Sequence, residues 1–108
     1  MATKINLIMD QGASFNTTYT VLDTNDSPID FSNYTATSQM RKSYTALIAY
    51  SFDAATFANG QITLSMNAAT TSTISAGRYV YDLEVADTGG NISRLVEGLI
   101  TVTPQVTK

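Results

Sequence analysis

The 108-residue chain has a net charge of −3, and apolar residues make up 44% of it, a balance that excludes intrinsic disorder and predicts one domain over residues 1–108. It contains neither cysteine nor histidine, which excludes disulfides, thiolate nucleophiles, imidazole bases and nearly every zinc or copper site. The scattered basic residues exclude a stripe that follows nucleic-acid phosphates. No apolar stretch is long enough for a signal-peptide core or a membrane span.

The N-terminal half of the chain predicts three strands. Residues 4–9 form the first strand, and residues 14–23 form the second, in which alternate residues share one face. Residues 24–28 form a turn, because asparagine and aspartate bond their own backbone and Pro28 fixes φ. The third strand covers residues 34–41. One face of the second strand carries Phe15, Thr17, Tyr19 and Val21, and the polar face of the third carries Thr35, Thr37, Gln39 and Arg41.

The middle of the chain predicts two more strands and a short helix. Residues 47–52 form the fourth strand, and residues 61–66 form the fifth after a turn at residues 58–60. Residues 67–75 lack a β-period, and Asn67 can cap a helical turn there that lets Ile74 close one end of the fold. Together with the C-terminal hairpin this makes about seven strands. We therefore expect an all-β fold, an antiparallel two-sheet β-sandwich that is Ig-like or related.

The last two predicted strands, residues 78–87 and 92–102, form a long hairpin. A two-residue loop at Gly89 and Gly90 suits a type I′ turn, which needs positive φ at both central positions. This choice of loop fixes the register of the hairpin. The inward-facing pairs are then Val85–Arg94, Leu83–Val96, Tyr81–Gly98 and Tyr79–Ile100, and the outward-facing pairs are Val80–Leu99, Asp82–Glu97, Glu84–Leu95 and Ala86–Ser93.

On the outward face of this hairpin, two carboxylates, those of Asp82 and Glu97, are predicted to lie opposite each other. Directly opposed carboxylates destabilise a sheet, so Asp82 and Glu97 require a cation, a raised pKa or an arginine from elsewhere. If the loop has three residues instead, Glu84 faces Arg94 and the opposition disappears. The apolar side chains on this face are covered either by a partner or by another part of the chain. They are Val80, Leu95 and Leu99.

Other patterns favour structure over chemistry. Asp82 and Glu97 resemble the carboxylate pair of a glycosidase, but a flat strand pair lacks a cleft, so catalysis is not expected. Residues 23–30 are rich in oxygen ligands, as calcium loops are, but turn chemistry explains them, and neither a metal nor a cofactor is expected. A set of aromatic residues could form a sugar-stacking platform, although their even spacing favours core packing. These are Tyr34, Tyr44, Tyr50, Phe52 and Phe57.

Four blocks of sequence carry a resemblance that spans most of the chain: residues 10–15 (DQGASF), 37–43 (TSQMRKS), 77–84 (GRYVYDLE) and 97–104 (EGLITVTP). On these blocks the chain resembles small virion structural proteins of tailed bacteriophages, especially the contractile-tailed phages that infect marine cyanobacteria. It is also similar to β-sandwich modules of phage baseplate and tail-fibre proteins. The resemblance implies a structural role and supplies no catalytic residue.

We therefore expect a non-enzymatic virion protein, made in the host cytoplasm, that assembles in the tail, baseplate or neck or on the capsid surface. Its partners are other virion proteins or further copies of itself, with no nucleic acid and no membrane. Arg41, Lys42 and Arg78 lie in the matching blocks near the acidic pair, and we hypothesise that an arginine, from this subunit or a neighbouring one, neutralises Asp82 and Glu97. A module that binds host-surface glycans is the alternative, and an enzyme is a distant third. The expected interface is Val80, Asp82, Glu84, Leu95, Glu97, Leu99, Arg41 and Arg78.

Overall fold

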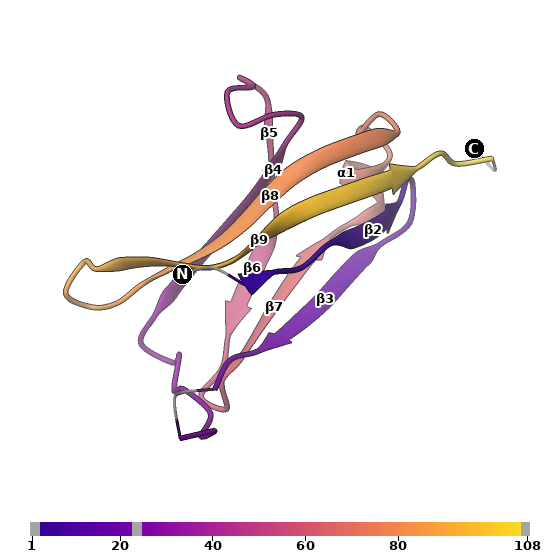
Figure 1. Cartoon of the computed structure of the whole chain (residues 1–108). Coiled ribbons are helices and arrows are strands. Elements are labelled where there is room, and N and C mark those ends of the chain that lie inside the picture. The colour runs from indigo at the N-terminus through magenta and orange to yellow at the C-terminus, as the bar shows by residue number, and fades with distance from the viewer. Residues whose placement is uncertain (1–2, 23–24, 107–108) are drawn as a thin grey trace.

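The computed structural model describes residues 3–22 and 25–106, which fold into two β-sheets packed face to face (Figure 1). The larger sheet contains Thr3–Lys4 (β1), Leu7–Asp10 (β2), Thr35–Arg41 (β4), Ala49–Ser51 (β5), Gly77–Ala86 (β8) and Ile92–Thr103 (β9). The smaller sheet contains Phe15–Thr20 (β3), Asp53–Thr56 (β6) and Gln61–Met66 (β7). The predicted all-β sandwich is confirmed.

The order of the strands is that of an Ig-like fold. The smaller sheet, β3-β7-β6, takes the place of strands B-E-D of an Ig domain, and β9-β8-β4-β5 takes the place of G-F-C-C′. One pairing differs from the antiparallel prediction, because β1 and β2 run parallel to β9 along its free edge. Turn signals describe only neighbours in sequence, so they carry no information on a pairing between the first and last strands.

Residues 49–56 form one extended run that changes sheets at Phe52. The first part, β5, pairs with β4, and the second part, β6, pairs with β7. The Phe52 N–H still donates to the Ser38 carbonyl of β4 at 3.0 Å, and its buried ring lies 5.7 Å from the Phe15 ring. The predicted strand at residues 47–52 therefore begins later than expected. It continues into β6, which the sequence did not predict because alanine has little preference for strands.

The core lies between the sheets and consists of aliphatic, methionine and aromatic side chains. The alternation predicted for the strands is confirmed at Tyr19 and Met40, which are buried on β3 and β4. The inward positions predicted for β8 are buried as well: Tyr79, Tyr81, Leu83 and Val85. The chain has neither cysteine nor tryptophan. Apolar packing therefore closes this sandwich without the disulfide and buried tryptophan of antibody domains.

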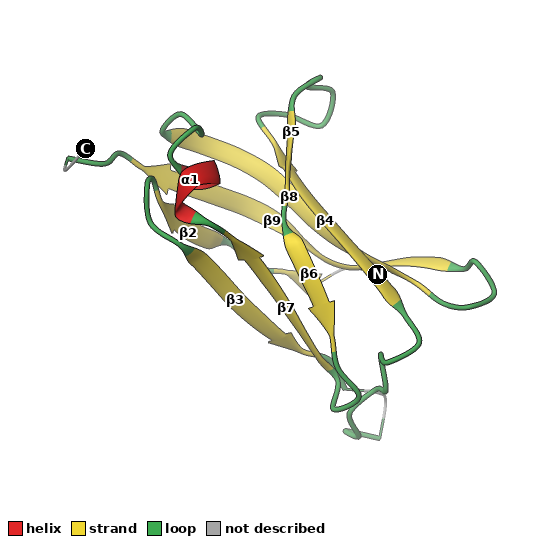
Figure 2. Ribbon diagram, turned by 180° about the vertical axis from the view of Figure 1, so that it is seen from behind, coloured by secondary structure: helices red, strands yellow, loops and turns green. Residues whose placement is uncertain are grey.

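The predicted helical turn is confirmed as α1 (Ala68–Thr71), which lies at one end of the sandwich (Figure 2). The Asn67 side chain caps it by accepting a hydrogen bond from the Thr70 N–H at 2.9 Å. Beyond the helix, Ile74 is completely buried in the core. The Thr71 hydroxyl donates to the Ala13 carbonyl at 2.8 Å and so ties α1 to the connection between β2 and β3. No helix of the described residues is long and apolar enough to cross a membrane.

The turn of the last hairpin has three residues, not the two that the sequence predicted. The Asp87 N–H donates to the Asn91 carbonyl at 3.0 Å and closes a loop of residues 88–90. Gly90 has a φ of 84°, whereas Gly89 is not in the left-handed region, as in a type I turn followed by a left-handed residue. The Asp87 carboxylate selects this loop, because it accepts from the N–H groups of Asn91 and Gly89, both at 2.9 Å. These hydrogen bonds, first that of Asn91, lower the pKa of Asp87.

Gly98 marks the place where the N-terminal segment crosses the inner side of β9. Between β1 and β2, the Asn6 side chain accepts a hydrogen bond from the Leu99 N–H at 3.1 Å. The Ile5 carbonyl accepts one from the Tyr81 hydroxyl at 2.8 Å. A Cβ at Gly98 would overlap that carbonyl oxygen. The backbone at Ile5 therefore occupies the space that a side chain on this inward-facing position would need.

Candidate functional site

The outer face of the larger sheet carries side chains in rows that cross β4, β8 and β9. The sequence predicted the polar face of β4 and the outward positions of β8 separately, and the register of the sheet brings the two side by side. Neighbouring positions on the same strands, such as Met40 and Leu83, point into the core. The rows are Thr37–Glu84–Arg94, Gln39–Asp82–Glu97 and Arg41–Val80–Leu99.

Leu95 is an extra residue in β9 that shifts the register of the hairpin. Leu83 pairs with Val96 and Glu84 pairs with Arg94, so a β-bulge accommodates Leu95. The three-residue turn moves the register by one near the loop, and the bulge restores the predicted register beyond it. Asp82–Glu97 and Val80–Leu99 are therefore paired as predicted. Three predicted pairs next to the loop are wrong: Val85–Arg94, Glu84–Leu95 and Ala86–Ser93.

The bulge also changes the apolar strip that was predicted on this face. Leu95 is partly buried and packs against the core, so it does not belong to the outer face. Val80 and Leu99 remain there, opposite each other, and 36% of Leu99 is exposed. The strip is thus reduced to one cross-strand pair.

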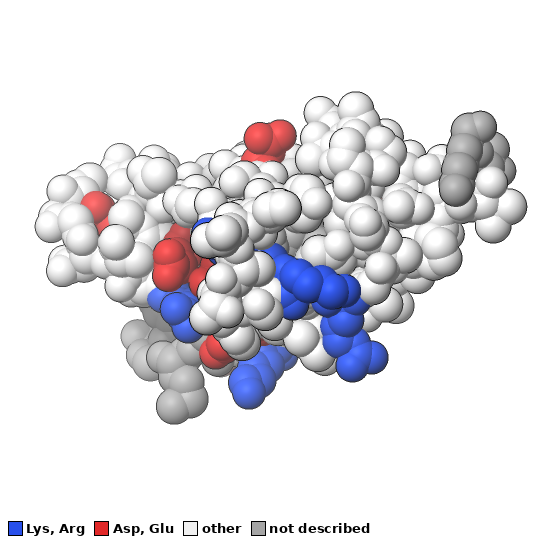
Figure 3. All heavy atoms as spheres, turned by 90° about the horizontal axis from the view of Figure 1, so that it is seen from above, with Lys and Arg blue, Asp and Glu red and all other residues white. Residues whose placement is uncertain are grey.

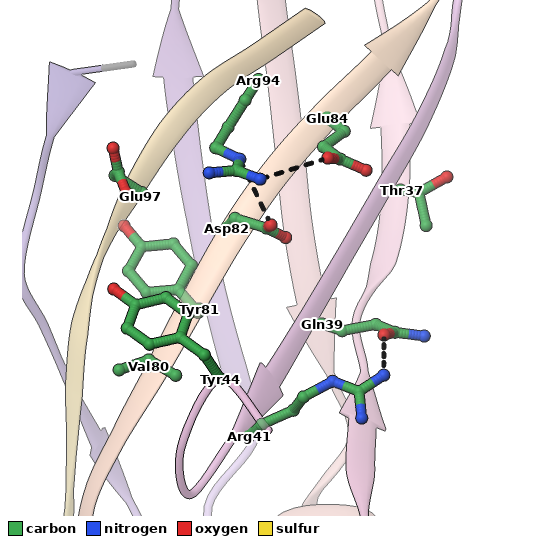
Figure 4. A pocket seen from close by; sticks show the side chains of 10 residues that line it. All are labelled: Thr37, Gln39, Arg41, Tyr44, Val80, Tyr81, Asp82, Glu84, Arg94 and Glu97. Carbon is green, nitrogen blue, oxygen red and sulfur yellow. Dashed lines mark hydrogen bonds and ion pairs between the residues drawn. The ribbon is translucent and has the colours of Figure 1, made fainter. Parts of the chain in front are cut away.

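Arg94 compensates the acidic residues of β8. Its Nε lies 3.5 Å from Asp82 Oδ2, and its second guanidinium nitrogen lies 3.9 Å from Glu84 Oε2 (Figure 4). This position follows from the three-residue turn, which places Arg94 opposite Glu84. An arginine of this chain, Arg94 on the facing strand, forms an ion pair with Asp82, as hypothesised, but it forms none with Glu97.

The other basic residues named from the sequence have different contacts. Arg41 donates to the Ala46 carbonyl at 2.7 Å and to Gln39 Oε1 at 3.2 Å, so it holds the loop after β4 in place. The Lys42 ammonium lies 4.9 Å from the centre of the Tyr79 ring, in a cation–π contact. Arg78 is exposed near the start of β8.

Asp82 has a raised pKa. Burial is the main cause, and the negative charge of Glu84 adds to it, while the Arg94 guanidinium acts in the opposite direction. Glu97 also raises the pKa of Asp82, and Arg41 lowers it. In the described part of the chain, Glu97 itself forms no ion pair. Figure 3 shows Lys and Arg side chains beside Asp and Glu on one side of the molecule, while most of the remaining visible surface is uncharged.

Residues of the three rows line a hollow of about 300 Å³, which we call the polar hollow. In Figure 4, the side chains of β8 lie in the middle, those of β4 and β9 lie on either side, and Tyr44 reaches over from the loop after β4. The Tyr44 side chain is 77% exposed. Sequence reasoning missed its place here, because the path of the loop depends on the hydrogen bond between Arg41 and the Ala46 carbonyl.

The loop of residues 42–48 is a second feature that the sequence did not reveal. Leu47 is 98% exposed and Ile48 is 69% exposed, and both precede β5, although the strand was expected to begin at residue 47. Together with Lys42, Tyr50 and Tyr79, they line a wider hollow of about 560 Å³. We call residues 42–48 the apolar loop.

The residues predicted for an interface are partly brought together. Five of them line the polar hollow: Arg41, Val80, Asp82, Glu84 and Glu97. Leu99 completes a row beside it. Leu95 packs inward, and Arg78 is not part of the lining.

The predicted aromatic platform does not form as a unit. Tyr34 and Tyr50 pack against the core, and Phe52 is buried within it. Tyr44 and Phe57 are exposed, the first above the polar hollow and the second just after β6. Core packing, the preferred interpretation, therefore holds for the first three residues.

In the oxygen-rich turn at residues 25–30, the Asp30 carboxylate is held by a hydrogen bond within the chain. The Ser32 N–H donates to Asp30 Oδ1 at 2.9 Å, and hydrogen bonds from Ser32 lower the pKa of Asp30. Asp23 and Thr24, which belong to the predicted strand and turn, lie outside the described residues. Over residues 3–22 and 25–106, no three or more carboxylates are placed to hold a metal ion.

No protein-family model and no curated protein matches the chain. Solved structures resemble it in fold at low identity. An internalin-like protein of Listeria monocytogenes is 19% identical with a TM-score of 0.48, over 94% of this chain and 28% of that one. A family 123 glycoside hydrolase from Clostridium perfringens is 12% identical with a TM-score of 0.46, over 97% and 24%. Murine CRIg is 8% identical with a TM-score of 0.41, over 93% and 92%. The chain thus spans about a quarter of the first two proteins.

Proposed function

We propose that this chain is a structural subunit of a tailed-phage particle, which acts by assembling with further copies of itself and with other virion proteins and catalyses no reaction. The sequence blocks described above support the phage assignment. The observation that carries the assembly role is the apolar loop, where Tyr44, Leu47 and Ile48 are 77%, 98% and 69% exposed.

The exposure of these side chains favours an interface. Burying a leucine or isoleucine side chain that is now in water contributes about 1.5–3 kcal/mol. Single exposed apolar residues are common on monomers, but three in one projecting loop, next to an open apolar hollow, are typical of contact surfaces. The apolar loop and the wider hollow that it helps to line therefore form a surface on which a second copy of the chain can pack.

The position of the loop adds a second reason. The apolar loop leads into β5, which is an edge strand of the larger sheet. An edge strand presents unpaired N–H and C=O groups that can pair with another chain. A copy that covers Leu47 and Ile48 would therefore also reach these backbone groups.

The carboxylates of the polar hollow give no support to a hydrolytic role. Asp82 is engaged by Arg94, and its side chain lies on the open outer face of the sheet. A glycosidase needs an acid and a second carboxylate on either side of a bound substrate, within a site that shields them from water.

The test of assembly is the mass of the purified chain in solution. We expect sedimentation equilibrium to give a multiple of 11.6 kDa at concentrations of roughly 10–100 µM, in the range of weak interfaces. The double variant Leu47→Ser, Ile48→Ser should sediment as a monomer. Ile8→Ser is the matched control, because Ile8 is 71% exposed on β2 at the opposite edge of the sheet.

The test of the phage assignment is separate. Mass spectrometry of gradient-purified particles from the encoding phage should find the chain in a fixed ratio to the major capsid protein. Its absence from purified particles contradicts the virion role, and a wild-type chain that is monomeric at every concentration contradicts self-assembly. Hundreds of copies per particle indicate the capsid, and a dozen or fewer indicate the tail.

A further inference from the structure

The polar hollow over β4, β8 and β9 offers hydrogen-bonding groups of both kinds. Arg41, Arg94 and Gln39 present N–H donors, and Asp82 and Glu97 present carboxylate acceptors. The contacts within the protein use only part of this capacity, since a guanidinium has five N–H groups and a carboxylate has about four acceptor sites. The groups that remain point into a space of about 300 Å³.

The charges around the hollow restrict what it can hold. The lining has three carboxylates, those of Asp82, Glu84 and Glu97, and two guanidiniums, those of Arg41 and Arg94, which leaves a net charge of −1. An anionic ligand would meet the carboxylates, and a cationic ligand would meet the guanidiniums. An apolar ligand would leave these polar groups without hydrogen bonds. A neutral ligand whose groups both donate and accept fits both kinds of partner.

Tyr44 adds an apolar surface to this polar lining. Its ring projects from the apolar loop toward β8 (Figure 4) and is largely exposed, so it contributes little to the core. A tyrosine ring provides a rigid, amphipathic contact area, and ligand sites combine such rings with a few convergent polar groups. The hollow lies at the lower end of the size range for small-molecule sites.

We propose that this hollow is a binding site for a neutral saccharide. The apolar face of a sugar ring lies against Tyr44, and its hydroxyls bond to Asp82, Glu97 and Arg94. A hydroxyl both donates and accepts, so one sugar ring can satisfy the carboxylates and the guanidinium at once. The site shares Tyr44 with the apolar loop but uses neither Leu47 nor Ile48, the two residues that the assembly test changes.

The experiment is an NMR titration of the isotope-labelled full chain, followed through its amide signals. The probes are the methyl glycosides of glucose, galactose, mannose and N-acetylglucosamine, with glucuronic acid as an anionic probe and a short lysine and arginine peptide as a cationic one. We expect at least one neutral glycoside to shift the amides of β4, β8 and β9 around the hollow, with saturation in the millimolar range that is usual for weak single-ring contacts.

Two variants with matched controls locate the binding. Tyr44→Ala should weaken it roughly three- to tenfold, the range for loss of one aromatic contact, whereas Phe57→Ala, a 45% exposed aromatic residue just after β6, should leave it unchanged. Glu97→Gln should weaken it as well, and Asp53→Asn on β6 should not. Tyr44, Phe57 and Asp53 are exposed, and Glu97 lies on the outer face of the sheet, so each variant is expected to keep a dispersed spectrum.

Several outcomes overturn the proposal. The first is that no neutral glycoside shifts the amides around the hollow, and the second is that Tyr44→Ala and Glu97→Gln bind as the wild type does. Tighter binding of glucuronic acid than of every neutral glycoside contradicts the argument that the carboxylates of the hollow disfavour an anionic ligand. Saturable shifts with the basic peptide alone assign the hollow to a protein partner instead. Release of methanol from a bound glycoside replaces a binding site by a hydrolytic one. Glu97 and Asp53 lie outside the apolar loop, so the comparison of Glu97→Gln with Asp53→Asn does not depend on contacts that this loop makes with another copy.

Discussion

Asp82 on β8 and Glu97 on β9 lie directly opposite each other on the outer face of the larger sheet. Arg94 approaches Asp82 to 3.5 Å and Glu84 to 3.9 Å, but Glu97 has no ion pair within the described residues. Glu97 is therefore the carboxylate whose repulsion is least compensated, and this relationship leads to the first two predictions.

The variant Glu97→Gln should be more stable than the wild type at neutral pH. It removes one of two directly opposed negative charges, an effect worth about 0.2–1 kcal/mol in a cross-strand pair. Urea denaturation measures the gain in the free energy of unfolding. Asp53→Asn on the smaller sheet removes a charge without this opposition and serves as the control. A Glu97→Gln variant that is less stable than the wild type means that Glu97 has a favourable partner.

The variant Asp82→Asn should change the dependence of stability on pH. Because the pKa of Asp82 is raised above its ordinary value of 3.8 in the folded chain, the folded state binds more protons than the unfolded state between that value and the raised one. The wild type therefore gains stability as the pH falls through this window. Thermal melts at about pH 7 and about pH 4 should show that Tm of the variant minus Tm of the wild type is larger at the higher pH. An unchanged difference would falsify the raised pKa.

The bulge at Leu95 gives a prediction that compares two leucines of one strand. Leu95 packs against the core, whereas Leu99 lies on the outer face and is 36% exposed. Leu95→Ala should therefore lower the free energy of unfolding by about 1–2 kcal/mol, and Leu99→Ala by about half of that or less. Chemical denaturation of both variants measures the difference. The two-residue turn places both leucines outside, so similar small losses for the two variants would contradict the bulge.

Gly98 should tolerate no side chain. In Gly98→Ala the new Cβ meets the Ile5 carbonyl oxygen, and relief of this overlap requires the N-terminal segment to move, at about 1–3 kcal/mol. Gly89→Ala is the control, because a Cβ there finds its nearest neighbour at 3.4 Å. Hydrogen exchange adds a local measurement: in Gly98→Ala the amides of β1 and β2 should lose protection. Equal stability of the two variants contradicts the close approach of Ile5.

The buried tyrosine pair should act as a unit. The Tyr81 hydroxyl lies 2.8 Å from the Tyr19 hydroxyl and donates to the Ile5 carbonyl at 2.8 Å, so Tyr19 donates to Tyr81. Tyr81→Phe leaves both of its partners unsatisfied and should cost about 1–3 kcal/mol, more than Tyr19→Phe, which removes one hydrogen bond. The double variant should cost less than the sum of the two, as its denaturation curve can show.

The same pair predicts the alkaline limit of stability. Burial raises the pKa of Tyr19 and of Tyr81 above 10.0. In the unfolded state both groups ionise from about pH 10, whereas in the folded state they remain protonated, so stability falls as the pH rises above that value. An absorbance titration should show these tyrosines ionising together with unfolding. In the double variant Tyr19→Phe, Tyr81→Phe this part of the decline should be absent.

The sequence by itself determined the class of fold and the faces of the strands, because alternation of apolar and polar residues is a local property. The polar face of β4, the inward tyrosines of β8, the Asn67 cap and the burial of Ile74 all follow from residues within one element. The absence of cysteine and histidine likewise excludes disulfides, thiolate nucleophiles and imidazole bases from composition alone.

Only the tertiary structure decided what depends on distant residues. The three-residue turn is selected by hydrogen bonds to the Asp87 carboxylate, and the bulge follows from the packing of Leu95 against the core. For this reason the sequence predicted neither the ion pair between Arg94 and Asp82 nor the inward position of Leu95. The parallel pairing of β2 with β9 and the place of Tyr44 above the sheet are long-range contacts. Local patterns carry no record of them, because one strand can present the same face to many different neighbours.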